Sequence, residues 1–246
     1  MRDSPIAWTD ATFNPWIGCA KVSPGCARCY AAELDARYRW TPDGWGGGKP
    51  RRRTSPAYWR QPETWNRDTP GALVFCGSLC DWLDDEVPRD WLHELTALVE
   101  RTPRLLWLLL TKRPELWRER LAGTSWVSGF PPNVAAGVSV ENQAAADERL
   151  PHLLAMPARR RFVSAEPLLS AVTLPPWPPG AVHQVIVGGE SGPRARAFSL
   201  ESLAALVAQT KARGALAYVK QDSGRLPGQQ GRIPDGLWRW KERLTL

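Results

Sequence analysis

The sequence of 246 residues has no long apolar run and contains only five cysteines and three histidines. No stretch approaches the roughly 18 apolar residues of a membrane-spanning helix, and the first residues, MRDSPIAWTD, lack the apolar core of a secretory signal. These absences exclude a membrane span and predict a cytoplasmic protein with reduced thiols and no membrane partner. In that setting, clustered cysteines bind a metal or react rather than form disulfides.

Positive charge and tryptophan are both abundant. Lysine and arginine number 32 against 25 aspartates and glutamates, which gives a net charge of +7, and there are 14 tryptophans. This surplus favours polyanionic partners such as nucleic acid, although a solvated basic face has the same composition. Tryptophans in the polar stretches DGWGGG and AYWRQPETWNR are suited to stacking on nucleobases.

Short apolar runs alternate with helical patterns along the chain, and no repeat of solenoid length is present. Each run is rich in Val, Ile and Leu and does not alternate with polar residues, as is typical of buried parallel strands. With a further strand before Cys19, the pattern predicts an α/β fold. The strand number favours a partial (β/α) barrel of about six to seven parallel strands over a doubly wound sheet. The runs are residues 73–77, 105–110, 133–140, 161–166, 183–190 and 215–220.

The predicted barrel domain spans residues 1–222, and two segments depart from its rhythm. Residues 39–70, rich in Gly, Pro, Arg and Trp, predict a long irregular insertion, which is usually functional or disordered. Residues 223–246 predict an irregular basic tail packed on or near the barrel. Helices are expected at residues 29–38, 88–102, 113–122, 141–155 and 199–214.

Polar residues follow the predicted strands at nearly the same offset. The carboxyl ends of the strands in a parallel barrel converge on the face that holds the active site. We therefore expect one shared site, although polar residues are also common wherever a strand meets solvent. The residues are Ser78, Asp81, Lys112, Glu141, Asn142, Glu166, Glu190 and Lys220.

The stretch NPWIGCAKVSPGCARCYAAEL places Cys19, Cys26 and Cys29 in a C-x6-C-x2-C pattern with no fourth cysteine or histidine nearby. Structural zinc prefers four ligands, whereas three thiolates can hold an iron–sulfur cluster and leave one iron open for a substrate or cofactor. The chemistry therefore favours an iron–sulfur cluster. A zinc site completed by Cys76 or Cys80, and a redox pair within the C-x2-C segment, are the alternatives.

The sequence also resembles a phage-associated family of uncharacterised three-Cys-motif proteins. The resemblance rests on WTDATFNPWIGCAKVSPGCARCYAAEL, LLTKRP, GVSVENQ, RFVSAEPLL, VIVGGESGP and YVKQ, from about Trp8 to Gln221. That family is similar to radical S-adenosylmethionine (SAM) enzymes, including the spore photoproduct lyase group. Those enzymes carry a three-cysteine [4Fe–4S] cluster in a partial (β/α) barrel. Their usual spacing is C-x3-C-x2-C, from which this chain departs.

The resemblance implies that Cys19, Cys26 and Cys29 ligate the cluster and that Tyr30 is the aromatic residue after the last ligand. It also implies that the Ser78–Asp81 segment faces the methionine part of SAM. The glycines of the VIVGGE stretch and the residue after them would line the adenine. These are Gly188, Gly189 and Glu190.

The expected function is therefore a radical SAM enzyme of lyase or transferase type that generates a 5′-deoxyadenosyl radical. A nucleic acid or nucleobase derivative is the leading substrate, for modification or repair. A flavodoxin or ferredoxin would supply electrons, and a further partner protein could complete the active site. A zinc-stabilised nucleic-acid-binding protein and a metal-dependent hydrolase or nuclease with structural thiols are the alternatives. Ser139, Glu141 and Asn142 are expected to bind SAM. Lys112, Glu166 and Lys220 are the expected catalytic residues, with Cys80 as a hydrogen-atom donor or a small buried thiol.

Overall fold

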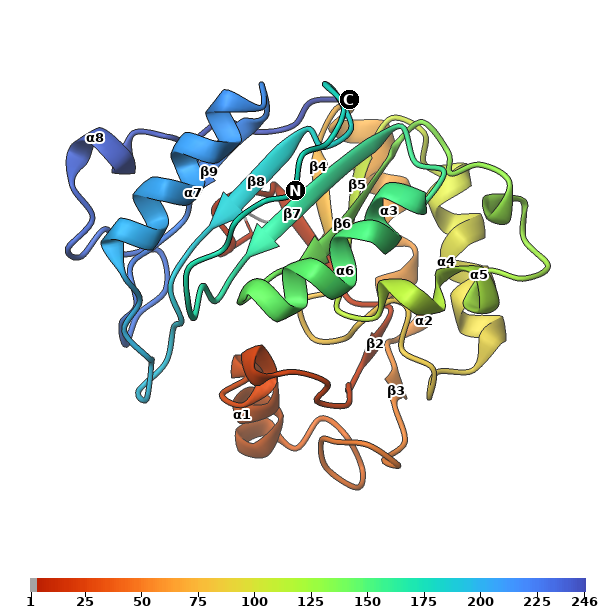
Figure 1. The fold of residues 1–246 in the computed structure, drawn as a ribbon. Helices are drawn as coiled ribbons and strands as arrows, with labels where there is room; N and C mark the ends of the chain where they lie inside the picture. Colours follow the sequence, from red (N-terminus) through yellow and green to blue (C-terminus); the bar gives the residue numbers. More distant parts are fainter. Residues whose placement is uncertain (1–3) are drawn as a thin grey trace.

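The computed structural model describes residues 4–246 and contains a parallel sheet of seven strands, which forms a partial (β/α) barrel (Figure 1). The sheet order is β1-β4-β5-β6-β7-β8-β9, so the strands of this sheet lie side by side in the order in which they occur along the chain. All neighbouring pairs are parallel, as the buried apolar runs predict. The strands are β1 (Ala11–Phe13), β4 (Leu73–Cys76), β5 (Leu106–Thr111), β6 (Val134–Ser139), β7 (Arg160–Ala165), β8 (Gln184–Val187) and β9 (Leu216–Val219).

Helices connect the strands, and most lie where the periodicity predicts them. The predicted helix at residues 113–122 is shorter in the structure, where a 3-10 turn, η2 (Pro114–Leu116), leads into the single turn α5 (Trp117–Arg120). A 3-10 turn also precedes the first helix, η1 (Pro24–Cys26), and another follows α5, η3 (Ser125–Val127). The long helices are α1 (Tyr30–Tyr38), α4 (Arg89–Arg101), α6 (Gln143–Ala155) and α7 (Leu200–Ala212).

The predicted irregular insertion is partly regular, so that expectation is wrong for its second half. It contains a short strand, β3 (Arg52–Arg53), which pairs antiparallel with β2 (Trp16–Ile17), followed by α2 (Pro56–Trp59) and α3 (Gln61–Asp68). The side chain of Ser55 caps α2, and a proline lies in the first turn of each helix, where its missing N–H is not needed. Proline here starts helices rather than preventing them.

The two faces of the sheet are covered differently. One packs against the helices in the large apolar core, and the other packs against Trp8, from the segment before β1. Trp8 lies 4.6 Å from Phe75 and 6.2 Å from Phe162 between ring centroids, so it fills the interior of the partial barrel. Leu244 from the tail joins the same cluster.

The tail, which includes the short helix α8 (Asp235–Trp238), runs beside the last strand of the sheet. The amide of Val219 donates to Trp240 O (2.8 Å), and the amide of Glu242 donates to Ala217 O (3.1 Å). Arg243 then reaches Asp10, just before β1, at 2.6 Å. Both ends of the described chain therefore meet between β9 and β1.

None of the helices in residues 4–246 combines the length and apolar character needed to span a bilayer.

Candidate functional site

The cysteine loop, residues 18–29, lies across the carboxyl ends of the central strands. The amide of Gly18 donates to Leu79 O after β4 (3.1 Å), and the guanidinium of Arg113 after β5 donates to Ala20 O (3.0 Å). Gly25 sits against Glu141 after β6, where a Cβ would lie 3.1 Å from the Glu141 carboxyl carbon. The structure thus brings the loop to the edge at which the predicted polar residues converge.

Three thiols are carried on this loop. Cys19, Cys26 and Cys29 are half-buried, and all five cysteines of the described chain are free. Cys26 Sγ lies 3.7 Å from Ser23 Oγ, and Cys29 directly precedes α1, where its side chain makes no capping hydrogen bond. Within residues 4–246, no three Cys, His, Asp or Glu side chains are grouped closely enough to form a metal site.

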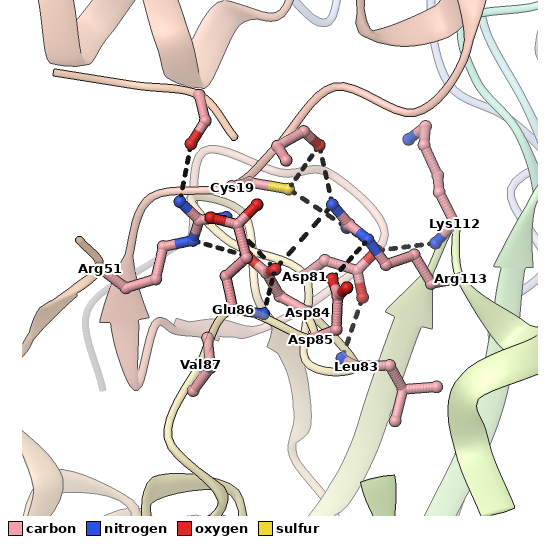
Figure 2. A network of polar contacts seen from close by, with 12 residues as sticks. Cys19, Arg51, Asp81, Leu83, Asp84, Asp85, Glu86, Val87, Lys112 and Arg113 are labelled. Atoms are coloured by element: carbon pink, nitrogen blue, oxygen red, sulfur yellow. Dashed lines mark hydrogen bonds and ion pairs between the residues drawn. The ribbon is translucent and has the colours of Figure 1, made fainter. Parts of the chain in front are cut away.

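Cys19 lies above a buried network of charges (Figure 2). Nη1 of Arg113 is 3.5 Å from Cys19 Sγ and 3.5 Å from Asp81 Oδ2. Arg51 forms a buried ion pair with Asp84 at 2.7 Å, which ties the insertion to the same network. Burial raises the pKa of Cys19 to about 12, and the charge of Asp81 adds to this effect while Arg113 opposes it. Cys19 is therefore a neutral thiol without a metal.

Asp81 and Ser78 lie at the end of β4, the second strand of the sheet, but their polar groups are occupied within the protein. The Asp81 carboxylate accepts from Thr111 Oγ1 (2.7 Å), the Lys112 amide (2.8 Å) and the Leu83 amide (3.0 Å). Ser78 Oγ bonds to Asn14, and its carbonyl accepts from the Tyr30 hydroxyl at 2.7 Å. Both residues hold the loops of the site in place.

Lys112 lies between the thiols and the next strand. Its Nζ is 3.1 Å from the hydroxyl of Ser139, the last residue of β6. Burial by itself would raise the pKa of Cys26, but the charge of Lys112 and hydrogen bonds from the loop bring it below its ordinary value. Cys26 is thus a thiol that ionises readily.

Glu141 and Asn142 follow β6, and both make contacts with the helix α6 that begins there. Glu141 is fully buried and pairs with Arg149 at 2.8 Å. Burial acts to raise the pKa of Glu141, but Arg149 and Lys112 hold it below its ordinary value. Asn142 caps α6 by accepting from the Ala145 amide at 2.9 Å.

On the other side of the edge, Glu166 after β7 forms an ion pair with Lys220 after β9. Each of these two side chains keeps 15% of its surface exposed. Gly188, after β8, lies against them, since a Cβ there would be 3.3 Å from Lys220 Cβ. The catalytic candidates Glu166 and Lys220 are thus brought together beside the loop.

Glu190 and Gly189 hold chain segments together. Glu190 forms an ion pair with Arg196, whose Nη1 also donates to Pro24 O of the cysteine loop at 3.1 Å. A Cβ at Gly189 would lie 2.3 Å from the Ser223 amide nitrogen, so this position requires glycine for packing. The adenine role expected for Gly189 therefore has a structural alternative in the close approach of Ser223.

The remaining two cysteines lie below the loop. Cys76 is fully buried in β4, and burial raises its pKa. Burial raises the pKa of Cys80 well above its ordinary value, and the charges of Cys76 and Cys19 add to the shift. Cys80 therefore behaves as a neutral, packed thiol.

Sequence reasoning missed several residues of the site. Arg113 follows a strand in LLTKRP, so its position was visible, but its contact with Cys19 was not. The pairing of Arg149 with Glu141 is not visible in the sequence, because Arg149 lies in the second turn of α6, eight residues after Glu141. Trp59 of the AYWRQPETWNR stretch is buried against Phe13, so the expectation that it stacks on a nucleobase is wrong.

Comparison with known protein families gives a match over nearly the whole chain. The model of a family described as "Protein of unknown function (DUF5131)" matches residues 3–236. No curated protein and no solved structure matches the chain. The family description names no reaction, and it mentions neither radical SAM chemistry nor a phage.

Proposed function

The chain belongs to the DUF5131 family of proteins of unknown function, and from its own site we propose that it is a radical SAM-type enzyme. Cys19, Cys26 and Cys29 would hold a [4Fe–4S] cluster. One observation carries the proposal: three free thiols share one short loop that lies over the carboxyl ends of parallel strands. In parallel barrels this edge holds the active site.

The donor set fits such a cluster. All three donors are thiols, the preferred ligands of cluster iron, and three of them leave one iron for SAM. Arg113 next to Cys19 and Lys112 near Cys26 place positive charge where the thiolates would be negative. When reduced and bound to SAM, a cluster of this kind supplies the electron that converts SAM into methionine and a 5′-deoxyadenosyl radical. A flavodoxin or ferredoxin is the class of protein that would deliver the electron.

The protein's own residues bind and orient the reactants. Lys112 carries a partly exposed ammonium group beside Ser139, suited to the carboxylate of the methionine part of SAM. Glu166 and Lys220 offer an acceptor and donors at the opposite side of the edge, where they would bind ribose hydroxyls or the substrate.

The carboxylates over the first strands support this assignment over a metal-dependent hydrolase. A hydrolase would use free carboxylates to bind its metal. Asp84 and Glu141 are instead fully buried and paired with Arg51 and Arg149. Ion pairs of this kind leave few oxygen ligands for a cation.

The test is anaerobic purification followed by iron, sulfide and zinc analysis and a visible spectrum. We expect about four irons per chain in the wild type and loss of iron and colour in Cys26→Ala. Cys76→Ala is the matched control, because it removes a thiol outside the loop and should keep the iron. A colourless protein with one tightly held zinc, lost in Cys76→Ala or Cys80→Ala as well, would contradict the proposal and identify a four-thiolate structural site.

A further inference from the structure

The positive charge of the chain is concentrated beside the cysteine loop. Residues 37–53 contain six of the lysines and arginines and a single carboxylate, Asp43. Their net charge of +5 accounts for most of the +7 of the whole chain. The rest of the protein is therefore close to electrical balance. Arg51 and Arg53 pair with Asp84 and Glu94, and within residues 4–246 the other four cations of the segment have no ion pair.

Within this segment, three arginines gather around a stacked aromatic pair. The rings of Tyr38 and Trp40 lie 5.2 Å apart at an interplanar angle of 17°. The guanidinium of Arg37 is 5.3 Å from the Tyr38 ring, and Arg52 donates to Trp40 O at 2.9 Å. We call Arg37, Tyr38, Arg39, Trp40 and Arg52 the arginine–aromatic patch.

The patch is open to solvent. Tyr38 is 51% exposed, and the three arginines are exposed as well. Within residues 4–246 none of these arginines pairs with a carboxylate, whereas the adjacent Arg53 pairs with Glu94. Exposed guanidinium groups without carboxylate partners, beside the exposed Tyr38 ring and the half-buried Trp40 ring, suit an anionic ligand that has flat, apolar parts.

Helix α1 connects the patch to the cysteine loop. It begins at Tyr30, directly after Cys29, and ends at Tyr38, so its nine residues span about 12 Å. Figure 1 shows α1 beyond the edge toward which the strand arrows point. Tyr30 and Tyr38, at its two ends, are the large aromatic side chains that are exposed in the described chain.

We propose that the arginine–aromatic patch binds a single-stranded polynucleotide and leads it along α1 to the cysteine loop. The arginines would contact successive phosphates, and an unpaired base would stack on the Tyr38–Trp40 pair. The stacked Tyr38–Trp40 pair favours a ligand with flat bases over one that offers charge alone. The reaction at the end of the path rests on the proposed function, but the binding does not.

The test measures anisotropy of fluorescein-labelled 12-mers of single-stranded DNA, single-stranded RNA and duplex DNA with the purified full chain. The Arg37→Gln/Arg52→Gln variant should weaken single-strand binding at least tenfold and lower the slope of log affinity against log salt by about 1.4. Tyr38→Ala should weaken it at least fivefold. The matched control is Arg104→Gln/Arg159→Gln, which removes exposed arginines just before β5 and β7. These arginines lie at the amino ends of the strands, away from the cysteine loop, so the change should alter affinity less than twofold.

Three outcomes would overturn the proposal: no binding of any oligonucleotide, tighter binding of the duplex than of single strands, or an equal loss in the control variant. Comparison of the DNA and RNA 12-mers identifies which strand is preferred. Iron content and melting temperature, measured on the same variants, separate this proposal from the first. A protein that holds iron but binds no oligonucleotide contradicts only the patch, and one that binds oligonucleotide without iron contradicts only the proposed chemistry.

Discussion

Over strands β4 to β6, the carboxyl edge of the sheet carries carboxylates buried against arginines. Over β7 to β9 it carries, besides the pair of Glu190 and Arg196, a carboxylate that faces a lysine. Asp84 and Glu141 are fully buried beside Arg51 and Arg149. The pair of Glu166 and Lys220 keeps 15% of each side chain exposed. The two halves have similar residues at similar offsets from the strands, but different surroundings.

The difference teaches which polar residues can meet a ligand. Arginine stays charged and binds a carboxylate through a planar fork, so its buried pairs form permanent supports for the cysteine loop. Lysine is a flexible point charge that can exchange one partner for another. We therefore regard the arginine pairs of the first half of the edge as the support of the site, and the second half, together with Lys112, as its binding side. Each prediction below tests this division.

The largest effect is expected for Arg149→Met. It leaves the Glu141 carboxylate buried without its partner, which should lower the free energy of unfolding by about 3–5 kcal/mol. Denaturant unfolding measures the loss, and Arg159→Met, at an exposed position, should change stability by less than about 0.5 kcal/mol. A small loss in Arg149→Met would remove the distinction between the halves.

The same pair predicts a pH dependence. The pKa of Glu141 in the folded protein is below its ordinary value of 4.5, so the stabilisation is present above pH 4.5 and lost as pH falls toward the folded pKa. The stability difference between the wild type and Arg149→Met should therefore narrow below about pH 4.5. A difference that stays constant between pH 7 and pH 4 would show that Glu141 is not its source.

A smaller effect on stability, but a larger one on binding, is expected for Lys220→Met. Loss of a partly exposed partner of Glu166 should cost about 1–2 kcal/mol of stability. Affinity for SAM, measured anaerobically by calorimetry, should fall at least tenfold, equivalent to about 1.4 kcal/mol. Lys49→Met, at an exposed position, is the control and should leave SAM affinity unchanged. Unchanged SAM affinity in Lys220→Met would place the binding side elsewhere.

The smallest effect is expected for Asn142→Ala. Loss of the side-chain cap of α6 should lower stability by about 1 kcal/mol and leave SAM affinity as it is. Asn142→Asp should restore stability, since aspartate also caps helices. If SAM affinity falls while the melting temperature stays constant, Asn142 belongs to the binding side after all.

The fold could be predicted well from the sequence because its strands are buried on both faces. Continuous apolar runs such as LLWLLL mark such strands directly. The helices at residues 56–68 are not predicted because the segment is rich in Gly and Pro. Pro56 and Pro62, however, lie in the first turns of α2 and α3, where proline is compatible with a helix.

The candidate site was predictable in position but not in contacts. The offset of Asp81 from β4 placed it at the edge, and this is where it lies. That its carboxylate binds the amides of Lys112 and Leu83 depends on how two loops turn, which local patterns do not encode. The contact between Arg113 and Cys19 joins residues 94 positions apart, and only the three-dimensional structure brings them together.

The tail beside β9 bears on how copies of this protein behave toward one another. An open sheet edge exposes unpaired amides and carbonyls that can pair with a second chain. Trp240 and Glu242 occupy these groups on Ala217 and Val219. A chain that stops at residue 239 would expose this edge, and light scattering would register the self-association that follows. The last few residues thus protect solubility, a task separate from any chemistry at the candidate site.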